Sequence, residues 1–302
     1  MRSAHDAGMR LRDLEWVVAL AHHEHMTDTA AALRVPQSTV SRALTRVEEE
    51  LGATLFERLP TGLRLTPLGG MVLEAARNID DRYRRLRSDI ATELDPESGV
   101  VRLAFLDSTG TALVPRILRR FRALAPNVRV SLRQEPGHEI IADLEARRAD
   151  LALARARPDG GYGWLPLSRE KLVLAVPPGH RLAGRGRVHL SELADDAFVT
   201  TPRGFGFRAQ TDALLAAAGI APEISFEAED AGTIEGLVAA GLGVAIVPAS
   251  FAGATESVGV SLGDVGAVRE IGLVWRTDVR LSAPAERLRA LVTEEFVLRG
   301  EA

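Results

Sequence analysis

Residues 26–51, MTDTAAALRVPQSTVSRALTRVEEEL, decide the fold of the first part of this chain. The stretch predicts a short helix that is capped by the Thr27 hydroxyl and stops near Leu33. Pro36 ends it because proline has no amide hydrogen and disfavours helix in the preceding residue. Proline suits a first helical turn, so a second helix is expected from Pro36 or Gln37. This arrangement predicts a helix-turn-helix over residues 26–45.

The second helix has one apolar and one polar side. Its apolar stripe recurs at spacings of four, three and four, and consists of Val40, Leu44, Val47 and Leu51. The polar side fits the DNA major groove, where arginine can bond guanine O6 and N7 and short hydroxyls permit close approach. Base contacts are expected near the start of this helix. The candidate DNA-binding residues here are Thr27, Arg34, Gln37, Ser38, Ser41, Arg42 and, for a phosphate, Arg46. An ordinary αα-hairpin with a solvated face is the alternative.

Residues on both sides extend this unit. Residues 55–58 and 63–65 flank Pro60-Thr61-Gly62, a pattern that predicts a small hairpin, or wing. Arg58 and Arg64 are expected at the base of the wing, within reach of phosphates. Before the helix-turn-helix, a scaffold helix is predicted by the spacing of Leu11, Leu14, Val18 and Ala21.

From Met9 to Thr66 the chain resembles the winged helix-turn-helix domain of the LysR-type transcriptional regulators. The resemblance rests on LRDLEWVVAL, on TAAALRVPQSTVSRALTRVEEELGATLFER and on LRLTPLG. It implies a DNA-binding regulator of transcription. Ser38 replaces a frequent proline, which leaves the base preference there open, and Thr61 replaces a frequent basic residue, which indicates a weaker wing contact. The family usually starts two residues before LRDL, so either Met1 or Met9 can be the start.

Composition excludes several classes of protein. With 302 residues the chain can build two or three domains, and without cysteine it has no disulfide framework, thiolate nucleophile or cysteine metal site. No long apolar run or cleavable signal pattern is present, so a soluble cytoplasmic protein without membrane contact is expected. The net charge of −4 argues against non-specific coating of nucleic acid. A local basic patch is sufficient for a DNA reader.

A long helix is predicted over residues 67–94, which begins with the capping pair Thr66-Pro67. At 1.5 Å per residue it would span roughly 40 Å. Its apolar residues keep near-heptad spacing and are Leu68, Val72, Ala76, Ile79, Tyr83, Leu86, Ile90 and Leu94. A seam this long favours pairing with a second copy of the chain. Burial against its own chain is the alternative.

After residues 95–99, which end the helix, strands and helices alternate. The pattern predicts an α/β domain with a mostly parallel sheet, and a last helix over 285–298. By resemblance, residues 100–302 form the two-lobed effector-binding domain of the same family, similar in fold to periplasmic binding proteins. Lobe one is expected to contain 100–172 and 269–302, and lobe two 173–268, joined by two crossing strands.

A ligand is expected beyond the carboxyl ends of these strands, near helix N-termini. Three segments fall there: 108–111, 200–205 and 243–248. The first two match the polar loops with which the family binds effectors. The candidate effector-binding residues are Ser108, Thr109, Thr111, Gln134, Arg155, Thr200, Thr201, Arg203 and Phe205. They favour a small polar or anionic metabolite, with no cofactor and no metal. Helix capping by serine and threonine is the alternative.

The sequence therefore predicts a LysR-type regulator whose DNA binding or bending responds to a small effector bound between two lobes. A homodimer or homotetramer on double-stranded promoter DNA is expected, with RNA polymerase as a further partner. One alternative is a solute-binding module whose head does not read DNA. Another is an enzyme that uses the cleft, but no nucleophile elbow, P-loop or paired-carboxylate signature is present, so we expect no enzyme.

Overall fold

The computed structural model describes residues 9–297 with the exception of 61, 96 and 156. Residues 1–8, Thr61 and Leu298 lie outside the described residues, together with the expectations stated for them. The chain forms two compact units, residues 1–90 and 91–302. Within the described part of the chain, no helix has the length and apolar character needed to cross a membrane.

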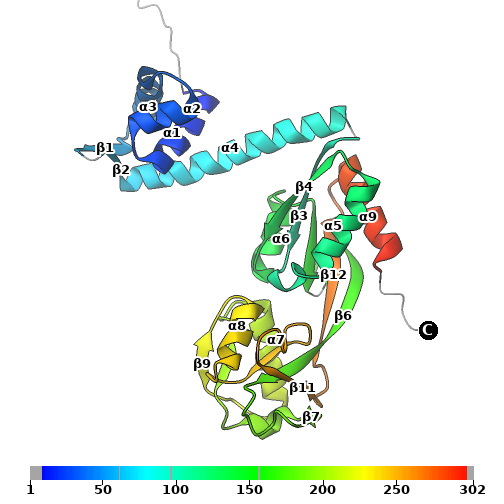
Figure 1. Cartoon of the computed structure of the whole chain (residues 1–302). Coiled ribbons are helices and arrows are strands. Elements are labelled where there is room, and N and C mark those ends of the chain that lie inside the picture. The colour runs from blue at the N-terminus through cyan, green and yellow to red at the C-terminus, as the bar shows by residue number, and fades with distance from the viewer. Residues whose placement is uncertain (1–8, 61, 96, 156, 298–302) are drawn as a thin grey trace, which may run out of the picture. The chain divides into compact units, whose positions relative to one another are not determined.

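The first unit contains the predicted helix-turn-helix. Its elements are α1 (Leu11–His23), α2 (Met26–Leu33), α3 (Gln37–Leu51), β1 (Phe56–Leu59), β2 (Gly62–Leu65) and α4 (Pro67–Leu94) (Figure 1). Pro36 is the extended residue before α3, as expected. The prediction that Thr27 caps α2 is wrong, because the helix already begins at Met26 and His25 precedes it without a side-chain bond. Thr27 instead lies exposed in the first turn.

The core of the first unit joins α1, α3 and the wing. Val40, Leu44 and Val47 of α3 are buried as predicted, whereas Leu51 is 45% exposed. In α1 Leu14 is buried as predicted, whereas Val17 and Leu20 are buried in place of the predicted Val18 and Ala21, one position later. The two valines are adjacent, so spacing alone did not determine which of them faces the core.

The wing is an antiparallel pair, β1 with β2, and it is tied to the turn before α2. Glu57 pairs with Arg64 and Arg58 with Leu63, so Arg58 and Arg64 lie on opposite faces of the hairpin. The Leu63 amide donates to the Glu24 carbonyl at 2.7 Å. Gly62 has a φ of +137°, and a Cβ there would lie 2.6 Å from the same carbonyl oxygen, so a larger residue would disturb this junction.

Helix α4 begins at its predicted cap and ends with exposed apolar side chains. The Gly69 amide donates to the Thr66 hydroxyl at 2.9 Å. Leu73 and Ala76 are buried. Farther along the helix the seam is uncovered in the single chain, with Ile79 43%, Leu86 55% and Ile90 52% exposed.

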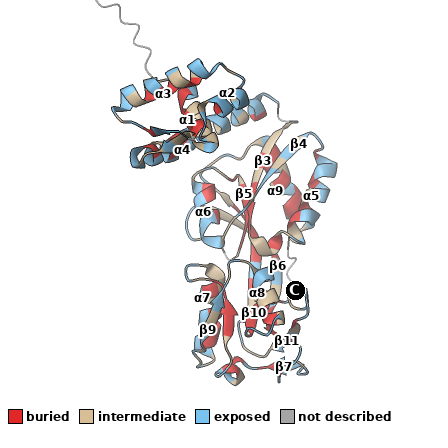
Figure 2. Ribbon diagram, turned by 60° about the vertical axis from the view of Figure 1, so that its left-hand side comes forward, coloured by how far each residue is buried: buried red, intermediate tan, exposed pale blue. Residues whose placement is uncertain are grey.

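The second unit contains two α/β lobes. Lobe one consists of β3 (Gly99–Phe105), β4 (Val128–Gln134), β5 (Leu151–Arg155), part of β6 (Tyr162–Val176), β12 (Val268–Arg276), a 3-10 turn at Asp107–Thr109, α5 (Leu113–Leu124), α6 (Gly137–Glu145) and α9 (Ala283–Glu295). Side chains alternate along β3 and β5. Leu103 and Leu153 pack with α5 and α9, whereas Ala104 and Ala152 pack with α6, so helices cover both faces (Figure 2).

Lobe two repeats this layering on the other end of β6. Its elements are β7 (Arg187–Val188), a 3-10 turn at Leu190–Leu193, β8 (Phe198–Thr200), α7 (Gly206–Ala217), β9 (Ile224–Glu227), α8 (Ala231–Ala239), β10 (Ala245–Pro248) and β11 (Val258–Leu262). Leu174 and Ile246 pack with α7, and Ala175 and Val247 pack with α8. Strands β7 and β11 were not predicted.

The main sheet is mixed, which corrects the expectation of a mostly parallel sheet. Its order is β4-β3-β5-β12-β6-β11-β7, with β10 also paired to β6. Only β3 with β4, β3 with β5, and β11 with β7 are parallel pairs within it. Strands β6 and β12 run antiparallel through the junction of the lobes, as the two predicted crossing strands, and Figure 1 shows β6 continuing from one lobe into the other.

Candidate functional site

The polar side of α3 presents a group of exposed side chains on the first unit. Gln37, Ser38, Arg42 and Thr45 are exposed, and Ser41 is half-buried. The Arg42 Nε donates to the Ser38 carbonyl at 3.1 Å, and its Nη2 donates to the Ser38 hydroxyl at 3.3 Å. Ser38 thus holds the guanidinium over the start of the helix, which a proline at this position could not do through a side-chain bond.

The remaining candidate DNA-binding residues differ in their surroundings. Arg34 is exposed and ends α2 in a left-handed conformation, with φ +54°. Arg58 is exposed, and Arg64 pairs with Glu57 at 2.7 Å. The Arg46 guanidinium bonds the carboxylate of Asp13, a partner in α1 that the sequence pattern did not reveal.

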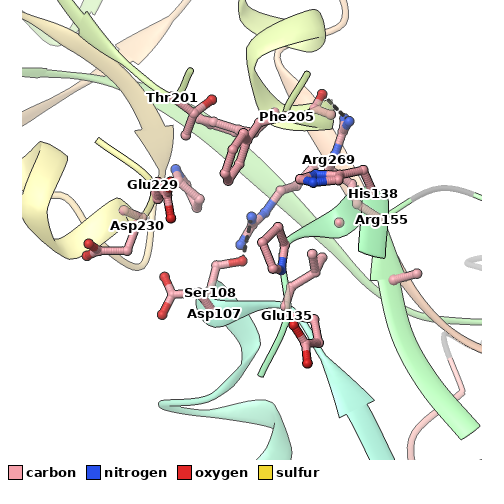
Figure 3. A pocket seen from close by; sticks show the side chains of 18 of the residues that line it. Asp107, Ser108, Glu135, His138, Arg155, Thr201, Phe205, Glu229, Asp230 and Arg269 are labelled. Carbon is pink, nitrogen blue, oxygen red and sulfur yellow. Dashed lines mark hydrogen bonds between the residues drawn. The ribbon is translucent and has the colours of Figure 1, made fainter. Parts of the chain in front are cut away.

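A cavity of about 530 Å³ lies between the lobes of the second unit (Figure 3). Lobe one lines it with residues that follow β3 and β4 and with the end of β5, at 106–108, 134–138 and 154–155. Lobe two contributes the starts of α7 and α8 and the end of β10, at 204–207, 229–231 and 247–248. Strand ends and helix starts therefore meet here, as the α/β pattern predicted.

The cavity brings together five of the nine candidate effector-binding residues: Ser108, Gln134, Arg155, Thr201 and Phe205. The other four do not line it, which corrects their placement. Thr109 is buried and donates to the Leu106 carbonyl at 2.7 Å, and Thr111 and Arg203 are exposed. Thr200 does not line the cavity, because it directly precedes Thr201 and consecutive residues of an extended chain point to opposite sides.

Arg269, which no sequence pattern indicated, is the most buried charged side chain of the cavity wall, at 5% exposed. Its Nε and Nη2 donate to Glu170 Oε2 at 2.8 and 2.6 Å, and its Nη1 donates to the Ser108 hydroxyl at 2.9 Å. Arg269 thereby ties the crossing strands to the loop after β3. No local signal could have shown this, because Glu170 lies 99 positions earlier.

Asp107 links the two lobes. Gln134 Nε2 of lobe one donates to its Oδ1 at 3.1 Å, and the backbone amide of Ala231, at the start of α8, donates to it from lobe two. Burial raises the pKa of Asp107, and the charge of nearby Asp230 raises it further. Asp230 itself caps α8 by accepting from the Thr233 amide at 2.7 Å.

Arg155 also reaches across the lobes. Its Nη1 donates to Gln210 Oε1 at 2.9 Å, and its Nη2 donates to the Gly206 carbonyl. Burial lowers the pKa of Arg155, and the neighbouring charge of Arg269 lowers it further. A Cβ at position 206 would lie 2.6 Å from Nη2. Because it has no side chain, Gly206 makes room for the Arg155 guanidinium.

Thr201 and Phe205 complete the lobe-two wall. The Thr201 side chain is 5% exposed, and its hydroxyl has no hydrogen-bond partner among the described residues. The Phe205 ring meets His138 of α6 edge-on, with ring centroids 5.3 Å apart. The hydroxyls of Thr200 and Thr211, which do not line the cavity, are buried without a partner in the same way.

The described residues include no group of three or more His, Cys, Asp or Glu side chains arranged to hold a metal ion. The cavity wall instead mixes arginines, carboxylates and hydroxyls with apolar side chains. This composition suits a small organic molecule that bears polar groups.

Comparisons with known proteins agree with both units. Residues 11–70 match the model of the bacterial regulatory helix-turn-helix protein, lysR family, and residues 94–297 match the LysR substrate binding domain. Two relatives from Bacillus subtilis (strain 168) are each 33% identical. The uncharacterized HTH-type transcriptional regulator YybE aligns over 95% of this chain and 99% of its own. The transcriptional dual regulator GltC aligns over 95% and 98%. The crystal structure of full-length CbnR complexed with its target DNA is similar at a TM-score of 0.76 and 25% identity, over 94% of this chain and all of that one.

Proposed function

This chain belongs to the LysR family of bacterial transcriptional regulators, and we propose which of its residues read DNA and which bind the effector. The family membership makes it a DNA-binding transcriptional regulator with an effector-binding domain. The predicted fold class is confirmed: a winged helix-turn-helix and a long helix precede a two-lobed α/β domain.

In our proposal residues 9–66 bind promoter DNA, with base contacts from Gln37, Ser38, Ser41 and Arg42. The exposure of Gln37, Ser38 and Arg42 on one face of α3 supports this role. Phosphate contacts come from the basic and hydroxyl side chains around that face, namely Thr27, Arg34, Arg46, Arg58 and Arg64. Because the Arg46 guanidinium is bonded to Asp13, fewer of its N–H groups are free to bind a phosphate than in the exposed arginines.

Residues 67–94 pair with a second copy of the chain in this proposal. The uncovered seam of α4 supports it, because exposed aliphatic side chains at near-heptad spacing gain free energy when a partner helix covers them. A two-fold dimer presents two copies of α3, so its operator should be an inverted repeat. Contact with RNA polymerase is part of the same proposal.

The effector site in this proposal is the cavity between the lobes, within residues 100–302. The observation that supports it most is that strand ends and helix starts of both lobes meet at one cavity, which the candidates Ser108, Gln134, Arg155, Thr201 and Phe205 line. Bridges across the lobes from Asp107 and Arg155 mean that a bound molecule would change lobe-to-lobe contacts. Coupling to DNA requires that the effector binds two arrangements with different affinity.

Selection of bound duplexes from a random DNA pool, at a fixed salt concentration, tests the DNA part. An enriched inverted repeat is expected. The selection is repeated with a pool of metabolites, because reading can depend on the effector. No enrichment in either selection, from a folded dimeric sample, would refute DNA reading and favour a solute-binding module with a non-reading head. Turnover of a metabolite would favour the enzyme alternative.

A further inference from the structure

The charges of the cavity between the lobes are divided into two groups. Positive charge comes from Arg155, Arg157 and Arg269, and negative charge comes from Asp107, Glu135, Glu229 and Asp230. Arg269 already bonds Glu170, so Arg155 and the group of Asp107, Glu229 and Asp230 are the charges considered for a ligand. Figure 3 shows Glu229 and Asp230 across the cavity from Arg155, with Asp107 near Ser108. A single charged group on a ligand could complement only one of these two groups.

Arg155 needs an anion. Among the described residues no carboxylate forms an ion pair with it, and it donates to the side-chain amide oxygen of Gln210 and to the backbone carbonyl of Gly206. Burial and the charge of Arg269 both disfavour its cationic form, as its lowered pKa shows. A carboxylate on a ligand would supply the missing opposite charge, and arginine bonds carboxylates with well-matched geometry.

The acidic side offers carboxylates to a cation, with both oxygens of Asp230 also accepting bonds from Thr233. Within the described part of the chain, Asp107, Glu229 and Asp230 form no ion pair. Arg269 lies near Asp107, but its guanidinium bonds Glu170 and Ser108. Asp107 and Asp230 repel each other, and this repulsion adds to burial in raising the pKa of Asp107. An ammonium group between them would relieve the repulsion and donate up to three hydrogen bonds.

Apolar side chains line the space between the charged ends. Ile141 of lobe one and Phe205, Ile234 and Val247 of lobe two face the cavity. The volume of about 530 Å³ lies in the range of sites that bury a small organic ligand. The ligand body that fits this wall is therefore apolar.

We infer that the effector is a zwitterion with an apolar body: its carboxylate binds Arg155 and its ammonium group binds Asp107 and Asp230. This inference rests on the proposed effector site and specifies its ligand class.

The test measures binding to the full-length dimer by calorimetry, with a panel of α-, β- and γ-amino acids. Three molecules that share a phenyl ring show the contribution of each charged group. L-Phenylalanine has both groups, 3-phenylpropanoate lacks the ammonium group, and 2-phenylethylamine lacks the carboxylate. For the zwitterion that binds best, removal of either charged group should weaken binding by roughly 10- to 100-fold.

Two variants test the proposed contacts of Arg155 with the carboxylate and of Asp107 with the ammonium group. Arg155→Gln should lower the affinity for the zwitterion by roughly 10- to 100-fold and leave the affinity for the amine unchanged. Asp107→Asn should lower the affinity for the zwitterion but not the affinity for the acid that lacks an ammonium group. The matched controls Arg203→Gln and Asp195→Asn change exposed residues outside the cavity wall and should bind like the parent protein.

The outcomes separate this inference from the proposed site. If plain acids bind as tightly as zwitterions and Arg155→Gln abolishes that binding, the cavity is the effector site but the ligand class is wrong. If zwitterions bind equally to the parent protein and to both cavity variants, the cavity itself is wrong. If no zwitterion in the panel binds, the inference is overturned.

Discussion

Asp13 of α1 and Arg46 of α3 form a two-point ion pair, with Nη2–Oδ1 at 2.6 Å and Nε–Oδ2 at 3.1 Å. The Asp13 carboxylate is buried, and it also accepts from the Arg10 amide at 2.9 Å, at the start of α1. One carboxylate therefore caps α1 and fixes the orientation of α3. The helix proposed to read DNA is positioned partly by a charge in a helix that presents no base contact in our proposal.

Asp13→Ala should destabilise the first unit by about 1–3 kcal/mol, because it removes hydrogen bonds to a charged group and a helix cap. The cost stays within that range because the Arg46 side chain is 27% exposed and water can solvate it when Asp13 is removed. Faster hydrogen exchange of the α1 and α3 amides checks the prediction. Glu49→Ala, at an exposed position of α3, is the control and should exchange like the parent protein.

The same pair gives a pH dependence. Burial alone would raise the pKa of Asp13, but hydrogen bonds from Arg46 and from the Arg10 amide outweigh it and hold the pKa below its ordinary value of 3.8. The stabilisation is therefore present above pH 3.8 and is lost as the pH falls through the lower folded-state pKa. Urea unfolding from pH 6 downward should show the parent and Asp13→Ala converging only below about pH 3.8. A stability difference that is constant down to the lowest pH would contradict this.

Arg42→Ala should cost roughly 1–3 kcal/mol of DNA affinity and relax the preference at one base position. The reason is that Ser38 holds the Arg42 guanidinium at the start of α3. Affinity for the selected operator and for single-base variants of it gives the measurement. Arg119→Ala, at an exposed position of α5, is the control. Equal loss on every sequence would identify Arg42 as a phosphate contact instead.

Thr201→Val should abolish the effector response and leave basal DNA binding intact. The variant keeps the shape of the side chain but removes a buried hydroxyl without a partner, so the ligand-free protein should be as stable as the parent or more stable. Thermal unfolding with and without effector, and an operator-binding assay, check both parts. Thr111→Val is the control, because Thr111 is exposed and outside the cavity wall. An unchanged response in Thr201→Val would remove Thr201 from the site.

Leu86→Asp should weaken dimerisation through α4, because it places a charge in the centre of the exposed apolar seam, where Leu86 is 55% exposed. Sedimentation across a concentration series would show dissociation at higher protein concentration than for the parent. Asn78→Asp adds the same charge at another exposed position of α4 and serves as the control. An unchanged assembly in Leu86→Asp would show that the seam does not pair with a second chain.

Local patterns predicted the elements but not the contacts between distant residues. Pro36 and Thr66-Pro67 marked helix starts because their effects act within one turn. The bonds of Arg269 to Glu170 and Ser108, in contrast, join positions 99 and 161 residues apart, and the pairing depends on the finished sheet. Strand β7 was missed because it has only two residues. The cavity carboxylates Asp107, Glu229 and Asp230 were not predicted, because acidic residues are common in the polar loops that follow strands.

The pairing of β6 with β12 limits how the effector-binding unit can move. The two strands pair from Val268 with Lys171 to Arg276 with Tyr162. The register shifts where Ile271 pairs with Ser168 and Gly272 with Pro166, so Leu167 is the extra residue, next to a proline that has no amide hydrogen to donate. The pairing ends at Val268 with Lys171, where both strands cross from lobe one into lobe two. The lobes are therefore joined by two adjacent backbone segments that resist separation, whereas twisting or bending at the crossing keeps the pairs. Lobe motion should therefore be a rotation of limited range about a fixed axis, so that ligand size sets an angle rather than a distance.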